Sequence, residues 1–219
     1  MARAAILDVD GTLVDTNYHH ALCWYRAFRD HDLAPPLWRL HRHIGMGGDK
    51  YVAAVAGDDV EERLGDALRD RWEELFDEEL AEVAPLPGAR DLVVELNERG
   101  LVVVLASSSI SAHLDAFIDL LEVRDVADAW TTKDDVDESK PSPDLVEAAL
   151  DKAATRDAVM VGDTPWDCKA AAKAGIGTIA VRTGGFCDGD LREAGALAIY
   201  DGAEDLRQRL DETPLAATT

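Results

Sequence analysis

The chain has 219 residues, of which 47% are apolar, enough for one α/β domain with a hydrophobic core and a smaller second module. No apolar run approaches the roughly 20 residues that a membrane span requires. The formal net charge of -22 repels nucleic acid and anionic lipid, so we expect neither as a partner.

The first predicted element is a buried strand over residues 4–10, because Ala4-Ala-Ile-Leu-Asp-Val-Asp10 is apolar nearly throughout. Residues 1–7 lack the pattern of a signal peptide, so we expect a cytoplasmic location. Residues from about 15 to 85 are rich in charge and show helical spacing without a convincing strand. We predict helices over 18–28 and within 60–83, where an apolar stripe comprises Leu64, Leu68, Trp72, Leu75, Phe76 and Leu80.

A hinge-like segment, Pro85-Leu-Pro-Gly88, precedes a regular alternation of elements. Helices are predicted over 89–99, 111–121, 142–152 and 165–174, and strands over 101–106, 127–131, 158–161, 177–181 and 197–200. This alternation indicates an α/β fold with a doubly wound, parallel, Rossmann-like sheet. We predict a core of residues 1–14 and 88–219, a helical module of residues 15–87 inserted into it, and a frayed tail over 212–219.

Two pairs of acidic residues follow predicted strands. Asp8 and Asp10 lie in Asp8-Val-Asp-Gly-Thr12, and Asp163 and Asp167 lie in Gly162-Asp-Thr-Pro-Trp-Asp167. The carboxyl ends of parallel strands meet at one edge of a sheet, where ligands of such folds bind. Carboxylates gathered there repel one another, and a hard cation such as Mg²⁺ would relieve the repulsion. The second pair has a plainer alternative, in which Asp163 or Thr164 only caps the next helix.

Groups suited to phosphate lie near the same edge. Ser107, Ser108 and Ser109 follow the strand over 101–106, and Lys140 precedes the helix over 142–152. An ammonium group there could neutralise both Asp8 and a bound phosphoryl group, which a protein of charge -22 needs in order to bind an anion. A serine-rich helix cap and a solvated lysine are the plainer alternatives.

The motifs, taken in order, resemble those of the haloacid dehalogenase (HAD) superfamily. The similarity covers nearly the whole chain and is to the branch with an inserted helical cap, near phosphoglycolate phosphatases and β-phosphoglucomutases. It implies a magnesium-dependent phosphatase that hydrolyses small phosphate monoesters. In this resemblance Asp8 is the nucleophile and forms an aspartyl-phosphate. Asp10 is the general acid that protonates the leaving oxygen and then the base that activates water.

The resemblance also implies the remaining ligands. Ser107 and Lys140 hold the transferring phosphoryl group, with Gly11 and Ser108 as further phosphate-binding positions. Mg²⁺ is bound by Asp8, by the backbone carbonyl of Asp10 and by Asp163, and Asp167 supports the water shell of the metal from the second shell.

Alternatives within and outside this family stay open. Dehalogenases and phosphonatases of the superfamily lack the aspartate found here at Asp10, which favours a phosphatase. A sugar-phosphate phosphomutase fits the same motifs. A non-catalytic, receiver-like module that only holds phosphate on Asp8 would share the doubly wound sheet, the acidic cluster and the lysine, but such modules have no inserted helical cap and do not carry the Asp-x-Asp-Gly-Thr motif. Phosphoglycolate, a sugar phosphate, a nucleotide monophosphate and a cofactor precursor all fit as the small phosphorylated metabolite. We expect a monomer, with a dimer as the alternative.

The inserted module gives weaker signals. Gly47, Gly48 and Lys50 lie in a segment that resembles the substrate-specificity loop of the cap, where glycines let the backbone approach a substrate and the lysine can meet a second anionic group. We expect His19 and His20 to be exposed or to have ordinary hydrogen-bond partners. Trp24 and Trp72 are predicted to pack, whereas Trp38 is predicted to line the mouth of the cap.

Overall fold

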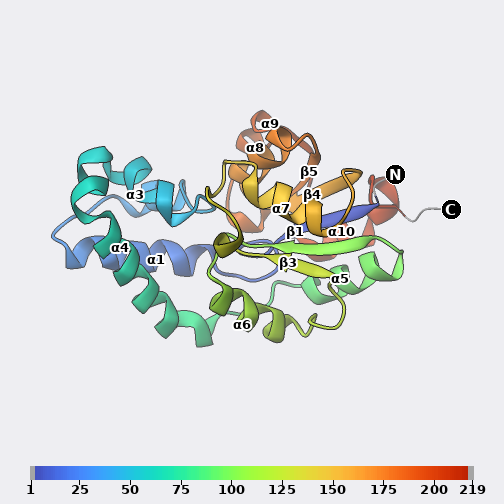
Figure 1. The fold of residues 1–219 in the computed structure, drawn as a ribbon, viewed down its shortest axis with the longest axis horizontal. Coiled ribbons are helices and arrows are strands. Elements are labelled where there is room, and N and C mark those ends of the chain that lie inside the picture. The colour runs from blue at the N-terminus through green and yellow to red at the C-terminus, as the bar shows by residue number, and fades with distance from the viewer. Residues whose placement is uncertain (1–2, 217–219) are drawn as a thin grey trace.

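The computed structural model describes residues 3–216, which fold around a parallel sheet (Figure 1). Its six strands are β1 (Ala4–Asp8), β2 (Val102–Ala106), β3 (Ala129–Thr131), β4 (Ala158–Gly162), β5 (Gly177–Val181) and β6 (Ala196–Tyr200), in the order β3-β2-β1-β4-β5-β6. The chain thus extends the sheet first to one side of β1 and then to the other. The predicted α/β fold with a doubly wound parallel sheet is confirmed.

Helices cover both faces of the sheet. They are α5 (Ala89–Glu98), α6 (Ser111–Leu121), α7 (Asp144–Lys152), α8 (Pro165–Lys173), α9 (Asp188–Glu193) and α10 (Ala203–Gln208). Figure 1 shows α7 and α8 on one side of the sheet and α5 and α6 on the other. Successive residues of β1 accordingly enter different cores: Ala5 and Leu7 pack with α5 and α6, whereas Ala4 and Ile6 pack with α7 and α8.

Four helices follow β1 and lie beyond one end of the sheet (Figure 1). These inserted helices are α1 (Asn17–Asp30), α2 (Leu37–His41), α3 (Gly48–Ala56) and α4 (Asp58–Glu79). The predicted stripe on α4 faces the core, because Leu68, Leu75 and Phe76 are buried and Trp72 packs against them. The chain leaves and re-enters the sheet side by side, since Val14 pairs with Pro85 in an antiparallel bridge. The division of the chain at residues 15–87 stays a prediction.

The sequence analysis missed some elements. It did not predict α2, α3, α9 or α10, which are short or begin at a glycine-rich or acidic turn. The predicted fraying from residue 212 is wrong as far as residue 216, because Leu215 is fully buried and Thr213 Oγ1 donates a hydrogen bond to the Leu210 carbonyl at 2.7 Å. Residues 217–219 lie outside the described part of the chain.

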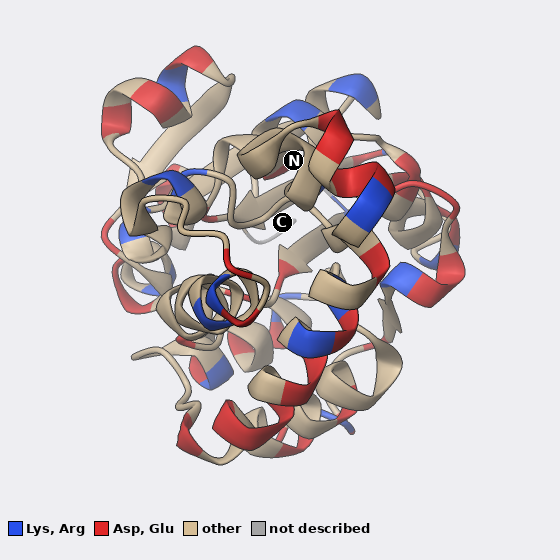
Figure 2. Ribbon diagram, turned by 90° about the vertical axis from the view of Figure 1, so that its left-hand side faces the viewer, with Lys and Arg blue, Asp and Glu red and all other residues tan. Residues whose placement is uncertain are grey.

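The surface carries the acidic composition of the chain. On the face formed by the inserted helices, Asp and Glu positions are spread over several helices, with Lys and Arg positions between them (Figure 2). No helix within residues 3–216 combines the length and the apolar character that a membrane span requires.

Candidate active site

Three buried carboxylates converge at the carboxyl edge of the sheet. Asp8 is the last residue of β1, and Asp163 follows β4, which pairs with β1 through Leu7 and Val161. Asp167 lies in the first turn of α8. One carboxylate oxygen from each of the three lies within 4.8 Å of the others. Parallel pairing of β1 with β4 therefore joins the two acidic motifs, which are far apart in the sequence.

Polar side chains hold two of these carboxylates in place. Thr12 Oγ1 lies 3.1 Å from Asp8 Oδ2 and 2.8 Å from Asp163 Oδ1, and Asn17 Nδ2 donates to Asp163 Oδ2 at 2.6 Å. Burial and the neighbouring charge of Asp167 raise the pKa of Asp163 to about 7, although the hydrogen bonds from Thr12 and Asn17 lower it. Thr12 and Asn17 had no assigned role in the sequence analysis, and the structure gives them contacts to this cluster.

Lys140 lies between two of the carboxylates. Its Nζ donates to Asp8 Oδ1 at 2.6 Å and to Asp167 Oδ1 at 2.8 Å, and all three side chains are buried. Burial alone would lower the pKa of Lys140, but the charges of Asp167 and Asp8 outweigh it and raise the pKa. Burial also raises the pKa of Asp8 well above its usual range, and the charge of Lys140 only partly offsets the effect. One ammonium group therefore does not balance this cluster.

The same segment caps a helix and joins the cluster. Thr164 is the N-cap of α8, where its Oγ1 accepts from Asp167 N and Asp167 Oδ2 accepts from Thr164 N at 3.0 Å. The other carboxylate oxygen of Asp167, Oδ1, accepts a hydrogen bond from Lys140 Nζ. The capping alternative is thus real, but it occupies only one oxygen of Asp167.

The cluster fits a hard divalent cation. Carboxylate oxygens are the ligands that Mg²⁺ takes from proteins. The pKa values of Asp8 and Asp163 are raised first by burial and then by repulsion from neighbouring carboxylates, and a bound cation would offset both effects. Asp10 contributes no side-chain oxygen to this cluster, and a role for its backbone carbonyl stays a prediction.

Asp10 instead lies at the centre of a separate hydrogen-bond network. Its Oδ1 lies 3.0 Å from His20 Nε2, and its Oδ2 accepts from Ser107 Oγ at 2.8 Å and from Ser109 Oγ at 3.1 Å. Burial would raise the pKa of Asp10, but the hydrogen bond and charge of His20 and the serine hydroxyls outweigh it and lower the pKa. The network joins the loop after β1, the loop after β2 and the helix α1.

The three predicted serines take different positions. Ser107 is fully buried and accepts a hydrogen bond from Ser109 N at 3.0 Å. Ser108 and Ser109 line a cavity, and the buried Ser108 Oγ has no hydrogen-bond partner in the described part of the chain. The hydrogen-bonding capacity of the Ser108 hydroxyl is therefore unused in the described chain, whereas the hydroxyl of Ser107 is already engaged with Asp10.

Gly11 permits close packing at the cluster. Its φ is +78°, and a Cβ there would collide with the side chains of Asp163 and Asn17. Only glycine lets the turn after Asp10 pass beneath the Asn17–Asp163 hydrogen bond. Gly11 does not line the cavity, so its predicted contact with phosphate stays a prediction.

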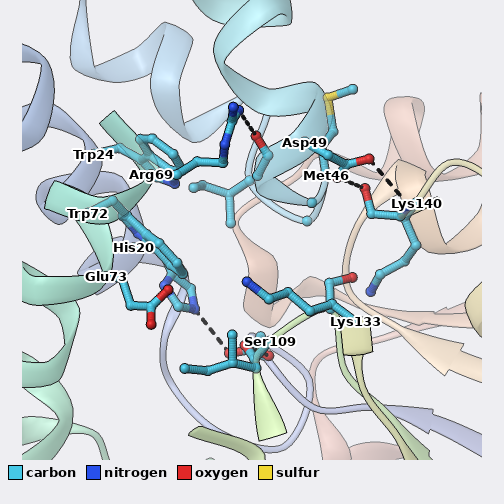
Figure 3. Close-up of a pocket in the computed structure, with 18 of the residues that line it drawn as sticks. His20, Trp24, Met46, Asp49, Arg69, Trp72, Glu73, Ser109, Lys133 and Lys140 are labelled. Atoms are coloured by element: carbon cyan, nitrogen blue, oxygen red, sulfur yellow. Dashed lines mark hydrogen bonds and ion pairs between the residues drawn. The ribbon is translucent and has the colours of Figure 1, made fainter. Parts of the chain in front are cut away.

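The acidic cluster and the Asp10 network open into a cavity of about 260 Å³ between the sheet edge and the inserted helices (Figure 3). Asp8, Asp10 and Lys140 form its inner end. The opposite wall comes from the inserted helices, where Trp24 and Trp72 stack with ring centroids 5.3 Å apart. Such a cavity can receive a phosphate ester with its phosphorus toward Asp8 and its organic part toward the tryptophans.

The glycine-rich segment of the insertion contacts the sheet edge. Gly47 and Gly48 line the cavity, and a Cβ at Gly47 would collide with Ser139. Lys50 does not line the cavity: its Nζ pairs with Glu138 Oε2 at 2.8 Å and donates to the Ser139 carbonyl at 3.2 Å. Asp49 lines the cavity and accepts from Ser139 Oγ. The segment is thus attached to the core through residues next to Lys140.

Several cavity residues were missed or assigned differently in the sequence analysis. His20 lines the cavity as a partner of Asp10, and Trp24 and Trp72 both pack and form the wall. Trp38, predicted to line the mouth, is 69% exposed and does not line the cavity. Helical spacing marks such side chains as inward-facing, but only the packed structure separates the cavity from the core.

The fold and this geometry define an α/β protein with a buried cluster of acidic groups and a lysine at the carboxyl edge of a parallel sheet. A family model described as haloacid dehalogenase-like hydrolase matches residues 5–181. The chain therefore belongs to the haloacid dehalogenase-like hydrolases, as the resemblance of its motifs implied.

Individual relatives agree with this assignment. A probable phosphatase, IndB, from Dickeya dadantii is 27% identical over 99% of this chain and 99% of its own length. A phosphoglycolate phosphatase from Rhodospirillum rubrum is 27% identical over 92% of this chain and 88% of its own length. The crystal structure of a hydrolase from Pseudomonas syringae superimposes with a TM-score of 0.90 and 29% identity, covering 95% of this chain and 98% of that one.

Proposed function

We propose that the protein is a magnesium-dependent phosphatase that hydrolyses small phosphate monoesters through an aspartyl-phosphate on Asp8. The observation that carries the proposal is the position of Asp8, which accepts from Lys140 at 2.6 Å, adjoins Asp163 and faces the cavity. The relatives named as phosphatases support the same chemistry.

The first step forms the bond between an Asp8 oxygen and phosphorus while the bond from phosphorus to the leaving oxygen breaks. A proton from Asp10 converts that oxygen into a neutral alcohol. Asp10 Oδ1 lies 3.0 Å from His20 Nε2, so a proton can be held between these two atoms beside the leaving group. Lys140 and the free hydroxyl of Ser108 are the groups that would contact the phosphoryl oxygens.

The second step restores the enzyme. Asp10, now deprotonated, takes a proton from water, the water oxygen bonds to phosphorus, and the bond from phosphorus to Asp8 breaks to release inorganic phosphate. The network that lowers the pKa of Asp10 keeps its carboxylate ionised, so that an acceptor for that proton is present. Asp8, Asp163 and the backbone carbonyl of Asp10 would hold Mg²⁺, with Asp167 behind them. The cation would neutralise charge on the phosphoryl oxygens.

The inserted module of residues 15–87 acts as a cap in this proposal. It encloses the reaction, and the paired segments at Val14 and Pro85 are where it would hinge on the core. The proposed substrate is a small phosphorylated metabolite, because the cavity of about 260 Å³ has room for a small organic group. We propose a cytoplasmic location for the reaction.

The test is turnover by the purified chain. With Mg²⁺, we expect repeated hydrolysis of p-nitrophenyl phosphate, loss of activity with a chelator, and a phosphorylated Asp8 peptide after rapid acid quenching. A single stoichiometric phosphorylation without turnover would instead support a phospho-acceptor module. Isomerisation of a sugar phosphate without release of inorganic phosphate would support a phosphomutase. Either result would refute the proposal.

A further inference from the structure

Lys133 is a cavity residue that the proposed mechanism does not use. It begins the short 3-10 helix Lys133–Asp135, which follows β3, and it lines the same cavity as Asp8. Figure 3 shows its side chain extending into the cavity from the side of Lys140 toward the side of His20 and Trp72. Lys133 is an exposed residue at the edge of this cavity, and its ammonium group would lie near the part of a substrate beyond the phosphoryl group.

Within residues 3–216, Lys133 differs from every other lysine in having no partner for its ammonium group. The chain has six lysines. The other five contact a carboxylate, a carbonyl or an aromatic ring: Lys50 with Glu138, Lys140 with Asp8, Lys152 with Asp135, Lys169 over Trp166 and Lys173 with the Pro141 carbonyl. In a protein of net charge -22, Lys133 is thus a lysine beside the cavity whose charge no carboxylate of the described residues neutralises.

The acidic neighbours of Lys133 in the sequence do not neutralise it. Asp134 Oδ2 accepts from Ser111 Oγ at 2.7 Å and from Ser111 N at 3.1 Å. Asp135 Oδ2 accepts from Thr132 N at 2.9 Å and pairs with Lys152 at 3.3 Å. Both carboxylates are thus engaged away from Lys133, which a reading of Lys-Asp-Asp in the sequence would not suggest.

The backbone fixes where the lysine begins. Lys133 N donates to the Ser109 carbonyl at 3.2 Å, and Ser107 N donates to the Thr131 carbonyl at 3.1 Å. The loop after β3 is therefore bound to the serine loop after β2, and Ser109 itself contacts Asp10. The ammonium group is carried on a flexible stem, but the stem starts at a fixed position next to the catalytic network.

The other two cationic side chains of the cavity are already engaged. Lys140 lies between Asp8 and Asp167, and Arg69 donates to Glu61 Oε1 at 2.8 Å and to Asp66 Oδ1 at 2.8 Å. Among the lysine and arginine side chains of the cavity, Lys133 is the one whose charged group has no partner in the described residues. We propose that Lys133 determines specificity by binding a second anionic group, a carboxylate or a second phosphate, on the leaving group of the phosphate monoester.

This inference rests on the proposed phosphatase function, and its test separates the two. The test compounds are propyl phosphate, 3-phosphooxypropanoate and propane-1,3-diol bisphosphate, which share one carbon chain and differ in the terminal group. Homologous compounds with two and four carbons vary the distance between the phosphate and the terminal group. Each is measured as a competitive inhibitor of p-nitrophenyl phosphate hydrolysis, so a compound need not be turned over to be compared.

For the wild type we expect tighter inhibition by the compounds with an anionic terminal group than by the alkyl phosphates. Lys133→Met should weaken their inhibition about tenfold and that of propyl phosphate by less than about twofold, because a charge-assisted hydrogen bond is lost only with the former. Lys133→Arg should retain most of the effect. Comparison of the carboxylate compound with the bisphosphate shows which anion is preferred. Weaker inhibition by either compound in Lys133→Met supports the inference.

Two further variants serve as controls. Lys169→Met makes the same change in charge on α8 away from the cavity and should leave all inhibition constants unchanged. Glu73, which lines the cavity and has no ion-pair or hydrogen-bond partner in the described chain, should act in the opposite direction. Glu73→Gln should tighten binding of the anionic compounds, because it removes a repelling charge.

Failure of the wild type to hydrolyse p-nitrophenyl phosphate would refute the phosphatase function itself. If the wild type turns over but anionic terminal groups give no tighter inhibition, the inference about Lys133 is wrong. It is also wrong if Lys133→Met weakens all compounds equally, which would show contact with the transferring phosphoryl group, or if Glu73→Gln weakens the anionic compounds as Lys133→Met does.

Discussion

The two ends of the cavity differ in how completely their polar groups are partnered. At the inner end, Asp8, Asp163, Asp167 and Lys140 are buried and joined by hydrogen bonds and ion pairs. At the outer end, Lys133 and Glu73 have no such partner within residues 3–216, and the tryptophans supply an apolar wall. In the proposed function, the first arrangement would fix atoms for one chemical step, whereas the second would leave groups free for the part of a substrate that varies between phosphate esters.

The comparison predicts that substitutions at the inner end abolish turnover, and that those at the outer end change which compounds bind. The largest effect is expected for Asp8→Asn. This variant should lose at least about 10³-fold in turnover of p-nitrophenyl phosphate, because an amide cannot act as the nucleophile.

Without metal, Asp8→Asn should also unfold at a higher temperature than the wild type at neutral pH. Burial raises the pKa of Asp8, so its ionised form destabilises the folded protein above the usual aspartate pKa. Thermal unfolding with a chelator measures this. An unchanged or lower unfolding temperature would mean that Lys140 already compensates the charge of Asp8.

Removal of divalent cations should have the next largest effect. A chelator is expected to reduce turnover by about 10²-fold or more, and added Mg²⁺ should restore it and raise the unfolding temperature. Asp163→Asn should weaken the thermal response to Mg²⁺. Equal Mg²⁺ stabilisation of the wild type and of this variant would contradict the assignment of the site.

The pH dependence of metal-free stability is a further test of the cluster. The pKa of Asp163 is about 7 in the folded chain, above its ordinary value of about 3.9. The folded state therefore holds a proton that the unfolded state loses, and the free energy of unfolding should fall as pH rises from about 4 to 7. Compared with Asp163→Asn in the same buffers, the wild type should show the steeper fall. Parallel curves would show that Asp163 does not contribute.

Lys140→Met should reduce both activity and stability. The substitution leaves Asp8 and Asp167 buried without their counterion, at a cost of about 3 kcal/mol or more. We expect an unfolding temperature lower by roughly 6 °C or more. The matched variant Lys173→Met, at the end of α8, loses a hydrogen bond to a backbone carbonyl and should change the unfolding temperature much less.

The smallest effect is expected in the apolar wall. Trp72→Ala should raise KM for p-nitrophenyl phosphate about threefold to tenfold with a smaller change in kcat, because the aryl group loses an aromatic contact. Trp38→Ala removes an exposed tryptophan from the same group of helices and should leave both constants unchanged. A larger loss in kcat than in KM for Trp72→Ala would assign this wall to the chemical step.

The inner end of the cavity could be predicted in detail from the sequence. The apolar patterns of the neighbouring elements are clear: Asp8 ends one strand, Asp163 follows another, and Lys140 precedes a helix. Parallel strands bring their carboxyl ends to one edge of the sheet. The outer end could not. Trp24, Trp72 and Glu73 lie in helices whose spacing shows an inward face but not whether that face meets the core or a cavity.

By itself, the sequence determined the alternation of strands and helices and the motifs at the strand ends, because periodicity and local residue order carry that information. Tertiary packing alone decided that Asp134 turns away from Lys133 toward Ser111, that Lys50 bonds to Glu138, and that Leu215 is buried. These outcomes depend on contacts between segments distant in the chain. A residue's own neighbours in sequence do not report which groups remain free to bind a substrate.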